Sequence, residues 1–449
     1  MNQMKKLIIP KTVVTSGRKN KVLHNYGVEF IDDEIIRIEA VEKFELSQYE
    51  GKIFRFPDYV LIPGFIQTHV HLCQTLFRGL ADDMELLDWL KKKIFPYENA
   101  HNPASLRASA RLGIAELQKN GTTTILDMGT LKHQEVIFEE LISGMMRAFS
   151  GKCMIDENNI FPSFKETTEE SIASSCNLAK EFHGKENDLV KYAFAPRFVL
   201  SCTEKLLKET MELVKDFEGS IYHSHASENK KEIIEVKQKF GMDNIEYFES
   251  INVLSDRTVL AHCIHTTPKE IELLKETQTA VAHCPSANLK LGSGIADIPH
   301  YLDKGIKVSL GADGPPCNNN LSIFTEMRLA ALIQKPVHGP AAMDAETIFK
   351  LATIDGAKAL NLEKMIGSIE VGKKADLVLL DLNKVSNSLS DDDRTIFSDI
   401  VYASNSANVK EVIIGGEWVV GKGESLKFDE NKLFYEGSEE LKKLIKRTE

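Results

Sequence analysis

The sequence has few of the features that mark secreted, membrane or nucleic-acid-binding proteins. It contains only seven cysteines in 449 residues, an odd number without a Cys-x-x-Cys pair. They lie at scattered positions: Cys73, Cys153, Cys176, Cys202, Cys263, Cys284 and Cys317. This pattern excludes a disulfide framework and a structural zinc knot, and it predicts reduced thiols in a cytoplasmic protein.

Long apolar runs and basic clusters are also lacking. No window holds the roughly 20 apolar residues that a membrane-spanning helix needs. The first twelve residues have a very short apolar run and no small-residue cleavage site, so we predict neither a signal peptide nor a membrane partner. The formal net charge of −11 argues against nucleic acid as the main partner. The basic stretch 442–447 is expected to be the solvated face of a last helix.

The sequence does have an ordinary globular composition, 43% hydrophobic and 27% charged, over a length that suits one barrel-sized domain and a smaller one. Eight short β-rich runs alternate with helical patterns. These runs are 59–66, 122–127, 147–155, 191–198, 220–225, 258–263, 279–284 and 307–313. The alternation predicts an α/β fold, a (β/α)8 TIM-type barrel over residues 59–365, with its chemistry at the C-terminal strand ends.

The two chain ends have a different pattern. Residues 1–58 and 366–449 hold short alternating runs separated by turns, among them 27–31, 35–38 and 375–380. We interpret them as one small β-sandwich domain formed by both chain ends. The alternative is two unrelated appendages.

The most informative motif is His69-Val70-His71, which follows the first apolar run. Residues two apart on a strand point to the same side, so the two imidazoles face one point. His225 ends the fifth run and Asp313 the eighth. Three neutral ligands and one anion suit a single divalent metal, zinc or alternatively iron(II), that acidifies a bound water. Lys152 lies on the third strand, whereas a lysine that bridges two metals is usually on the fourth, which favours one metal.

Other polar residues stand near these strand ends. Glu228, three residues after His225, is positioned to move a proton from water to a substrate ring, unless it is a surface residue of the following helix. His262 is either a fifth ligand or a residue that polarises the water. Arg197 either contacts a substrate acceptor or pairs with a neighbouring loop. His283 is expected to line the mouth without binding metal, and His223 either to be structural or to support a metal ligand from behind.

At this point the sequence resembles the amidohydrolase superfamily, in its branch of purine and aminotriazine aminohydrolases. The motifs that carry the resemblance are 63–71 (PGFIQTHVH), 225–228 (HASE), 261–263 (AHC), 283–291 (HCPSANLKL), 311–313 (GAD) and 367–377 (GSIEVGKKADL). The resemblance covers nearly the whole chain in the expected order. It implies that Glu228 is the proton shuttle and that His262 lies beside the hydrolytic water. The metal ligands that it implies are His69, His71, His225 and Asp313.

The resemblance divides on the substrate. Residues 76–83, 318–321 and 326–330 are similar to deaminases of S-adenosylhomocysteine, methylthioadenosine or 5′-deoxyadenosine, in which a glutamate at the position of Glu98 holds the ribose. Residues 147–152, 164–171 and 196–198 are similar to guanine deaminases, in which an arginine at the position of Arg197 reads the purine carbonyl. Lys152, His283 and Asn288 complete the predicted substrate-binding set.

The sequence therefore predicts a metal-dependent hydrolytic deaminase of an amino-purine or adenosine-type nucleoside. Guanine deamination is the first alternative. A second is release of chloride or an alkylamine from a triazine-like ring, and a third is a barrel that has become a binding subunit. The partner is a small molecule, and a homo-oligomer is allowed because relatives often associate.

Overall fold

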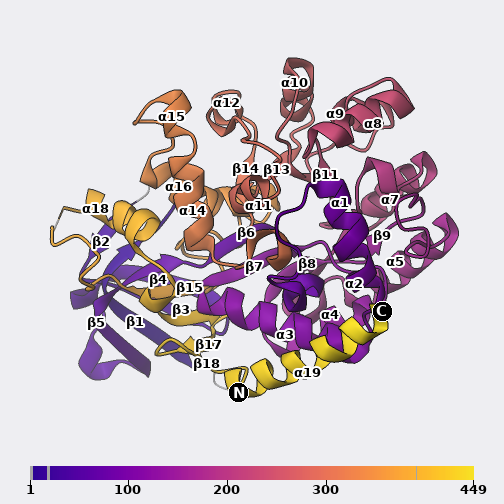
Figure 1. Cartoon of the computed structure of the whole chain (residues 1–449). Coiled ribbons are helices and arrows are strands. Elements are labelled where there is room, and N and C mark those ends of the chain that lie inside the picture. Colours follow the sequence, from indigo (N-terminus) through magenta and orange to yellow (C-terminus); the bar gives the residue numbers. More distant parts are fainter. Residues whose placement is uncertain (1–3, 18–20, 391, 449) are drawn as a thin grey trace.

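The computed structural model describes residues 4–17, 21–390 and 392–448. Eight parallel strands form a barrel at its centre, with helices around the outside (Figure 1). In barrel order the strands are β6 (Phe65–Val70), β7 (Thr122–Asp127), β8 (Arg147–Ser150), β10 (Val190–Pro196), β11 (Ile221–Ala226), β12 (Thr258–His262), β13 (Ala280–His283) and β14 (Val308–Leu310). A short strand, β9 (Cys153–Met154), also pairs with β10. The predicted fold class is confirmed.

The barrel closes where β14 meets β6. The Asp313 N–H donates to the His69 carbonyl oxygen at 3.0 Å, and Val70 forms a parallel bridge with Asp313. Gly311 allows this close approach, because a Cβ there would lie 2.6 Å from the same carbonyl oxygen. The closure therefore brings Asp313 beside the histidines that end β6.

Helices alternate with the strands and bury their apolar faces against the barrel. The longer ones are α3 (Pro103–Lys119), α4 (Gln134–Ser143), α5 (Thr168–Phe182), α7 (Glu204–Asp216), α8 (Lys230–Phe240), α9 (Asn244–Ser250), α10 (Pro268–Glu276), α14 (Ile323–Leu332) and α16 (Ala345–Leu351). The shorter ones are α1 (Leu86–Trp89), α2 (Phe95–Asn99), α6 (Lys185–Asp188), α11 (Pro285–Lys290), α12 (Ile298–Asp303), α13 (Pro315–Asn318), α15 (Lys335–His338), α17 (Ile354–Ala359) and α18 (Arg394–Ser398). Capping boxes begin several of them, as Thr267 and Glu270 do for α10.

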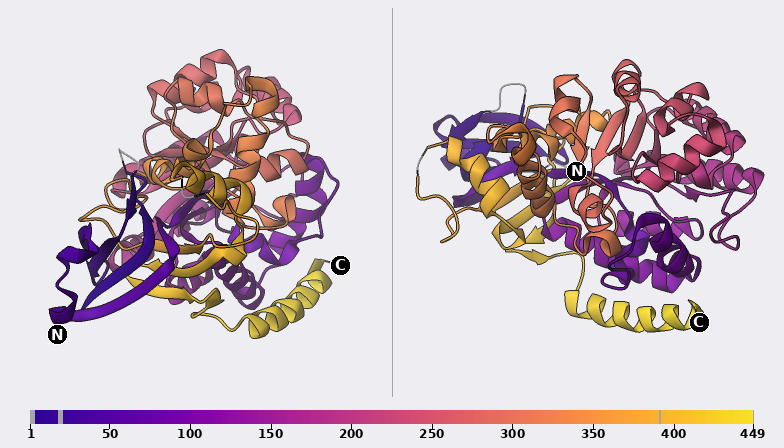
Figure 2. Two further views of the ribbon diagram at one scale, coloured as in Figure 1. Left: turned by 90° about the vertical axis from the view of Figure 1, so that its left-hand side faces the viewer. Right: turned by 45° about the horizontal axis from the view of Figure 1, so that its top comes forward.

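The two chain ends form one sheet beside the barrel (Figure 2). Its strands are β1 (Lys5–Val14), β2 (Val22–His24), β3 (Tyr26–Ile31), β4 (Glu34–Ala40), β5 (Gly51–Pro63), β15 (Leu377–Asp381), β16 (Val409–Ile414), β17 (Glu417–Gly421) and β18 (Glu424–Ser425). Hydrogen bonds join them in the order β18-β17-β16-β15-β5-β1-β3-β4, and β2 pairs with β1. Among the described strand pairs of this sheet, β1 and β5 are parallel and the others are antiparallel. The limits 1–58, 59–365 and 366–449 stay our proposal for the domains.

The run 59–66, expected to be one barrel strand, is two strands that meet at Gly64. Up to Pro63 the chain is β5 and pairs with β15. The Gly64 N–H still donates to Asp376 of the small sheet, at 2.9 Å, whereas the Phe65 N–H donates to Gly121 beside β7, at 3.0 Å. The backbone changes sheets at this residue, a long-range choice of partner that an apolar run does not encode.

Two further contacts tie the parts together. Arg147 on β8 and Asp376 before β15 form a buried bidentate ion pair, with N–O distances of 2.6 and 3.0 Å. The last helix, α19 (Glu430–Thr448), lies along α3 (Figures 1 and 2), where Leu444 is buried against Phe77. Its lysines face solvent, as expected. Among the described residues, no helix is long and apolar enough to cross a membrane.

His101, at the start of α3, makes stability depend on pH. Its Nε2 donates to the Cys73 carbonyl at 2.7 Å, and its Nδ1 accepts from Ser105 at 3.1 Å. Burial lowers the pKa of His101 to about 4, against about 6.5 in an unfolded chain. The contribution of His101 to the free energy of unfolding is therefore fully present above pH 6.5. It is lost as the pH falls toward 4, because between these pH values only the unfolded chain takes up the proton.

We expect His101→Gln to have a smaller free energy of unfolding than the wild type at pH 7.5. Between pH 7.5 and 5.5, however, this free energy should fall by about 1 kcal/mol less in the variant than in the wild type. The measurement is the urea-unfolding free energy of both proteins at the two pH values. Equal losses in the two proteins would contradict the assignment.

Candidate active site

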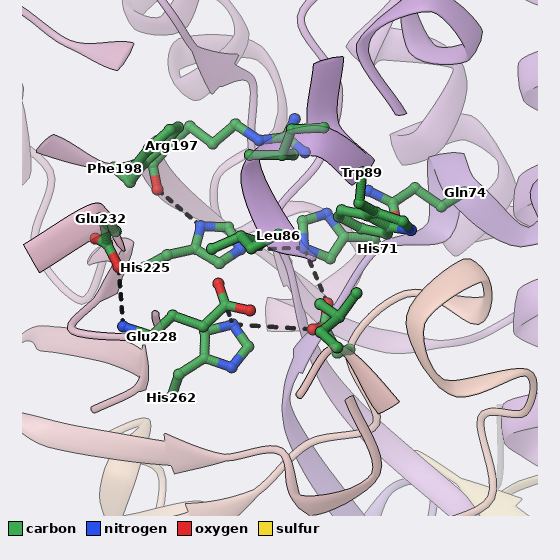
Figure 3. A pocket seen from close by; sticks show the side chains of 13 residues that line it. His71, Gln74, Leu86, Trp89, Arg197, Phe198, His225, Glu228, Glu232 and His262 are labelled. Carbon is green, nitrogen blue, oxygen red and sulfur yellow. Dashed lines mark hydrogen bonds and ion pairs between the residues drawn. The ribbon is translucent and has the colours of Figure 1, made fainter. Parts of the chain in front are cut away.

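Four side chains from three strand ends converge at the C-terminal mouth of the barrel. The Nε2 atoms of His69 and His71 lie 3.4 and 3.3 Å from Asp313 Oδ1. His225 on β11 brings its Nε2 to 3.3 Å from that of His71 (Figure 3). Parallel strands end at the same rim of a barrel, so residues over 240 positions apart meet there.

The hydrogen bonds behind these rings fit a metal at the point of convergence. His225 Nδ1 donates to the Arg197 carbonyl at 2.7 Å, which leaves a lone pair on its Nε2. His223 Nδ1 donates to the Val259 carbonyl at 2.9 Å, so its Nε2 accepts the proton of His69 Nδ1 at 2.8 Å. Among the described residues His69 Nε2 has no hydrogen-bond partner. Lone pairs with this outward support are what a divalent cation requires.

The charges agree with that interpretation. Burial lowers the pKa of His71 and of His225 well below the usual range, so both rings are neutral at pH 7. Burial by itself would raise the pKa of Asp313, but His69 and His71 lower it far below its ordinary value. The cluster therefore offers imidazoles, of which His71 and His225 are neutral, and one carboxylate, the donor types expected for zinc or iron(II).

Glu228 and His262 stand beside this cluster. Glu228 Oε2 lies 3.5 Å from His262 Nε2, which is 3.8 Å from Asp313 Oδ2. Burial, followed by the charge of Asp313, raises the pKa of Glu228 well above its usual value. Burial lowers that of His262 to about 4, and its Nδ1 donates to Asn288 Oδ1 at 2.8 Å. A carboxyl group whose pKa is raised thus faces a neutral imidazole, as groups that exchange protons in active sites often do.

The cluster opens into a cavity at the C-terminal mouth of the barrel. Its lining residues are His71, Gln74, Leu86, Trp89, Leu90, Arg197, Phe198, His225, Glu228, Glu232, His262, Leu291 and Asp313. Three of them have a buried polar atom without a partner among the described residues: His71 Nδ1, Gln74 Oε1 and Trp89 Nε1. Apolar side chains (Leu86, Trp89, Leu90, Phe198 and Leu291) thus stand beside polar groups in one cavity, a combination that suits an aromatic heterocycle.

Among the five residues predicted to bind substrate, only Arg197 lines the cavity. Glu98 lies behind it and binds its guanidinium at 2.6 and 3.2 Å. Lys152 pairs with Glu166 at 2.8 Å. Asn288 supports His262, and His283 is fully buried beyond the lining. Substrate contact by these four residues stays a prediction.

Sequence reasoning did not select Gln74 or Trp89. Gln74 had a usable signal, because it stands three residues after His71, in a short 3₁₀ helix (Leu72–Phe77) that begins at the site. Trp89 is on α1, far from any strand end in sequence, and had none. Glu232 was also overlooked: its carboxylate accepts the backbone N–H of Glu228 at 2.9 Å.

A closed parallel barrel with a His/Asp cluster and a protonatable carboxylate at its C-terminal mouth defines the class of metal-dependent barrel hydrolases. The family comparison agrees with the geometry. The amidohydrolase family model matches residues 60–419, and this chain belongs to that family. The predicted family and the predicted enzyme class are confirmed.

Similar proteins carry related names. A 5-methylthioadenosine/S-adenosylhomocysteine deaminase from Caldanaerobacter subterraneus subsp. tengcongensis is 34% identical over 443 residues, 98% of this chain and 99% of that protein. One from Thermoanaerobacter pseudethanolicus is 36% identical over 389 residues, 86% and 88% of the two chains. The crystal structure of an adenosine deaminase from Xanthomonas campestris with bound zinc has a TM-score of 0.91 at 27% identity, covering 99% of both chains.

Proposed function

We propose that this enzyme releases ammonia from an amino-purine, with 5′-modified adenosines such as methylthioadenosine and S-adenosylhomocysteine as the main substrate class. The carrying observation is Glu228, a buried carboxyl group 3.5 Å from His262 at the rim of the His/Asp cluster. The names of the relatives at 34% and 36% identity support the same substrate class.

A divalent metal, zinc by our proposal, would be held by His69, His71, His225 and Asp313 and would supply an acidified water as nucleophile. Glu228 takes a proton from that water and delivers it to the ring nitrogen beside the amino-bearing carbon. The carbon would then accept the water oxygen, Glu228 would move the remaining proton of that oxygen to the amino group, and the C–N bond would break to release ammonia and leave a ring carbonyl. His262 accepts at Nε2, because its Nδ1–H is directed to Asn288.

The test is a substrate panel with zinc-loaded protein: methylthioadenosine, S-adenosylhomocysteine, 5′-deoxyadenosine, adenosine and guanine, each followed by ammonia release. Turnover of the 5′-modified adenosines supports the proposal. No ammonia from any of the 5′-modified adenosines would refute it. Chloride release from a chlorotriazine, assayed separately, would point to the triazine-ring alternative.

A second candidate, deamination of a free base with a ring carbonyl such as guanine, is favoured by one observation. Arg197 is held by Glu98 in a buried bidentate pair, and Gln74 donates to the same carboxylate at 2.7 Å. This arrangement fixes a guanidinium and an amide at the cavity wall, where they can read a carbonyl oxygen and a ring N–H.

The pairing also gives a prediction about Glu98. Because its carboxylate is engaged and lies behind Arg197, we expect Glu98→Gln to act through Arg197 and Gln74. It should raise KM for a nucleoside and for its free base by the same factor, about tenfold. Steady-state kinetics with both substrates provide the measurement. A rise confined to the nucleoside would instead place Glu98 on the ribose.

A further inference from the structure

A fully buried carboxylate, Glu326 on α14, lies just outside the cavity lining. It accepts three hydrogen bonds: from the Ser286 N–H at 3.1 Å, from the Ser286 hydroxyl at 2.5 Å and from the Asn318 side-chain amide at 2.8 Å. Ser286 belongs to the segment after β13 and Asn318 to the segment after β14. One carboxylate therefore joins the two loops that follow neighbouring barrel strands.

The first arm of this contact leads to His262. Ser286 lies in the first turn of α11, and Asn288 lies two residues further along the same helix. Asn288 Oδ1 accepts from His262 Nδ1 at 2.8 Å and so fixes which nitrogen of His262 faces Glu228. The position of α11 decides whether that hydrogen bond forms, and Glu326 holds α11 at its first turn.

The second arm leads to Asp313. The Asn318 amide that donates to Glu326 also donates to the Ala312 carbonyl at 2.7 Å. Asp313 itself has a left-handed backbone conformation, with φ of 60°, which is unfavourable for a residue with a Cβ unless its neighbours hold it. Asn318 supplies that restraint on one side, and the Asp313 N–H bond to His69 supplies it on the other.

Resting on the proposed function, we propose that Glu326 is a positioning residue for the active site: it holds the loops after β13 and β14 together, so that His262 and Asp313 keep their places. Replacing its carboxyl group with an amide leaves a buried donor without an acceptor. A glutamine has one acceptor oxygen, so its amide must face either Ser286 or Asn318 donor to donor.

The test compares Glu326→Gln with Glu270→Gln. Glu270 is a matched control, because it is also buried and also accepts backbone N–H groups, from Thr267 and Ile245 at 2.8 Å, but bonds to no site residue. We expect Glu326→Gln to weaken zinc binding and to lower kcat at saturating zinc, each about tenfold. Glu270→Gln should change either by less than about threefold.

Single-arm variants refine the test. Ser286→Ala should lower kcat with zinc affinity unchanged, and Asn318→Ala should lower zinc affinity first. If Glu326→Gln lowers the melting temperature but changes zinc affinity and kcat no more than Glu270→Gln does, the proposal is overturned. A chelator-competition titration reads zinc affinity without substrate, so the positioning role stays measurable even if no amino-purine is turned over and the proposed function fails.

Discussion

The Glu228→Gln variant is expected to keep its metal and to lose turnover by about 10²–10⁴-fold, the usual contribution of general acid–base catalysis. Glutamine is close to glutamate in shape, so the cavity should survive. It cannot take a proton from water and return it to a ring nitrogen. Zinc content, measured on the purified variant, and kcat for the best substrate of the panel together give the result.

A matched control is Glu235→Gln, an exposed carboxylate on α8, the helix that begins two residues after Glu228, which should keep wild-type turnover. If Glu228→Gln retained the normal rate, the proton shuttle would have to be another residue. Loss of zinc from this variant would mean that the carboxylate supports the metal rather than the proton transfer.

The His69→Ala variant should lose metal and activity together. His69 contributes a lone pair directed toward the cluster and is supported from behind by His223 at 2.8 Å. Its removal leaves a cavity next to buried rings whose protonation is unfavourable, because burial lowers the pKa of His71 and of His225. We expect zinc binding to weaken at least 100-fold and turnover to fall to background.

The control is His338→Ala, which removes a histidine on α15 remote from the cluster and should bind zinc as the wild type does. Measurable ammonia release by metal-free His69→Ala would contradict the proposed chemistry. Zinc content is determined by mass spectrometry on dialysed protein, and activity with and without added zinc separates weak binding from lost catalysis.

Much of this architecture was predictable from local pattern. The eight β-rich runs and the helices between them predict the barrel, because the apolar residues of each run show that the strand is buried. His69 and His71 share a strand face by the two-residue period, and strand ends meet at one mouth in any such barrel. The converging set of His69, His71, His225 and Asp313 follows from those two rules.

Other features depend on contacts between distant segments. The run 59–66 divides at Gly64 because the backbone there changes its hydrogen-bonding partner from Asp376 to the Gly121 region. The pairing of Glu98 with Arg197, 99 residues apart, determines which group faces the substrate. Neither residue carries a local signal for the other.

The sequence by itself determined the fold class, the family and the set of His and Asp side chains that meet at the barrel mouth, because strand period and strand ends are local properties. Only the tertiary structure decided which side chains line the cavity, which ring nitrogen each histidine turns inward and which buried carboxylates support the loops. Those choices depend on the hydrogen-bond partners that a buried polar group finds after the chain has closed, and such partners come from anywhere along it.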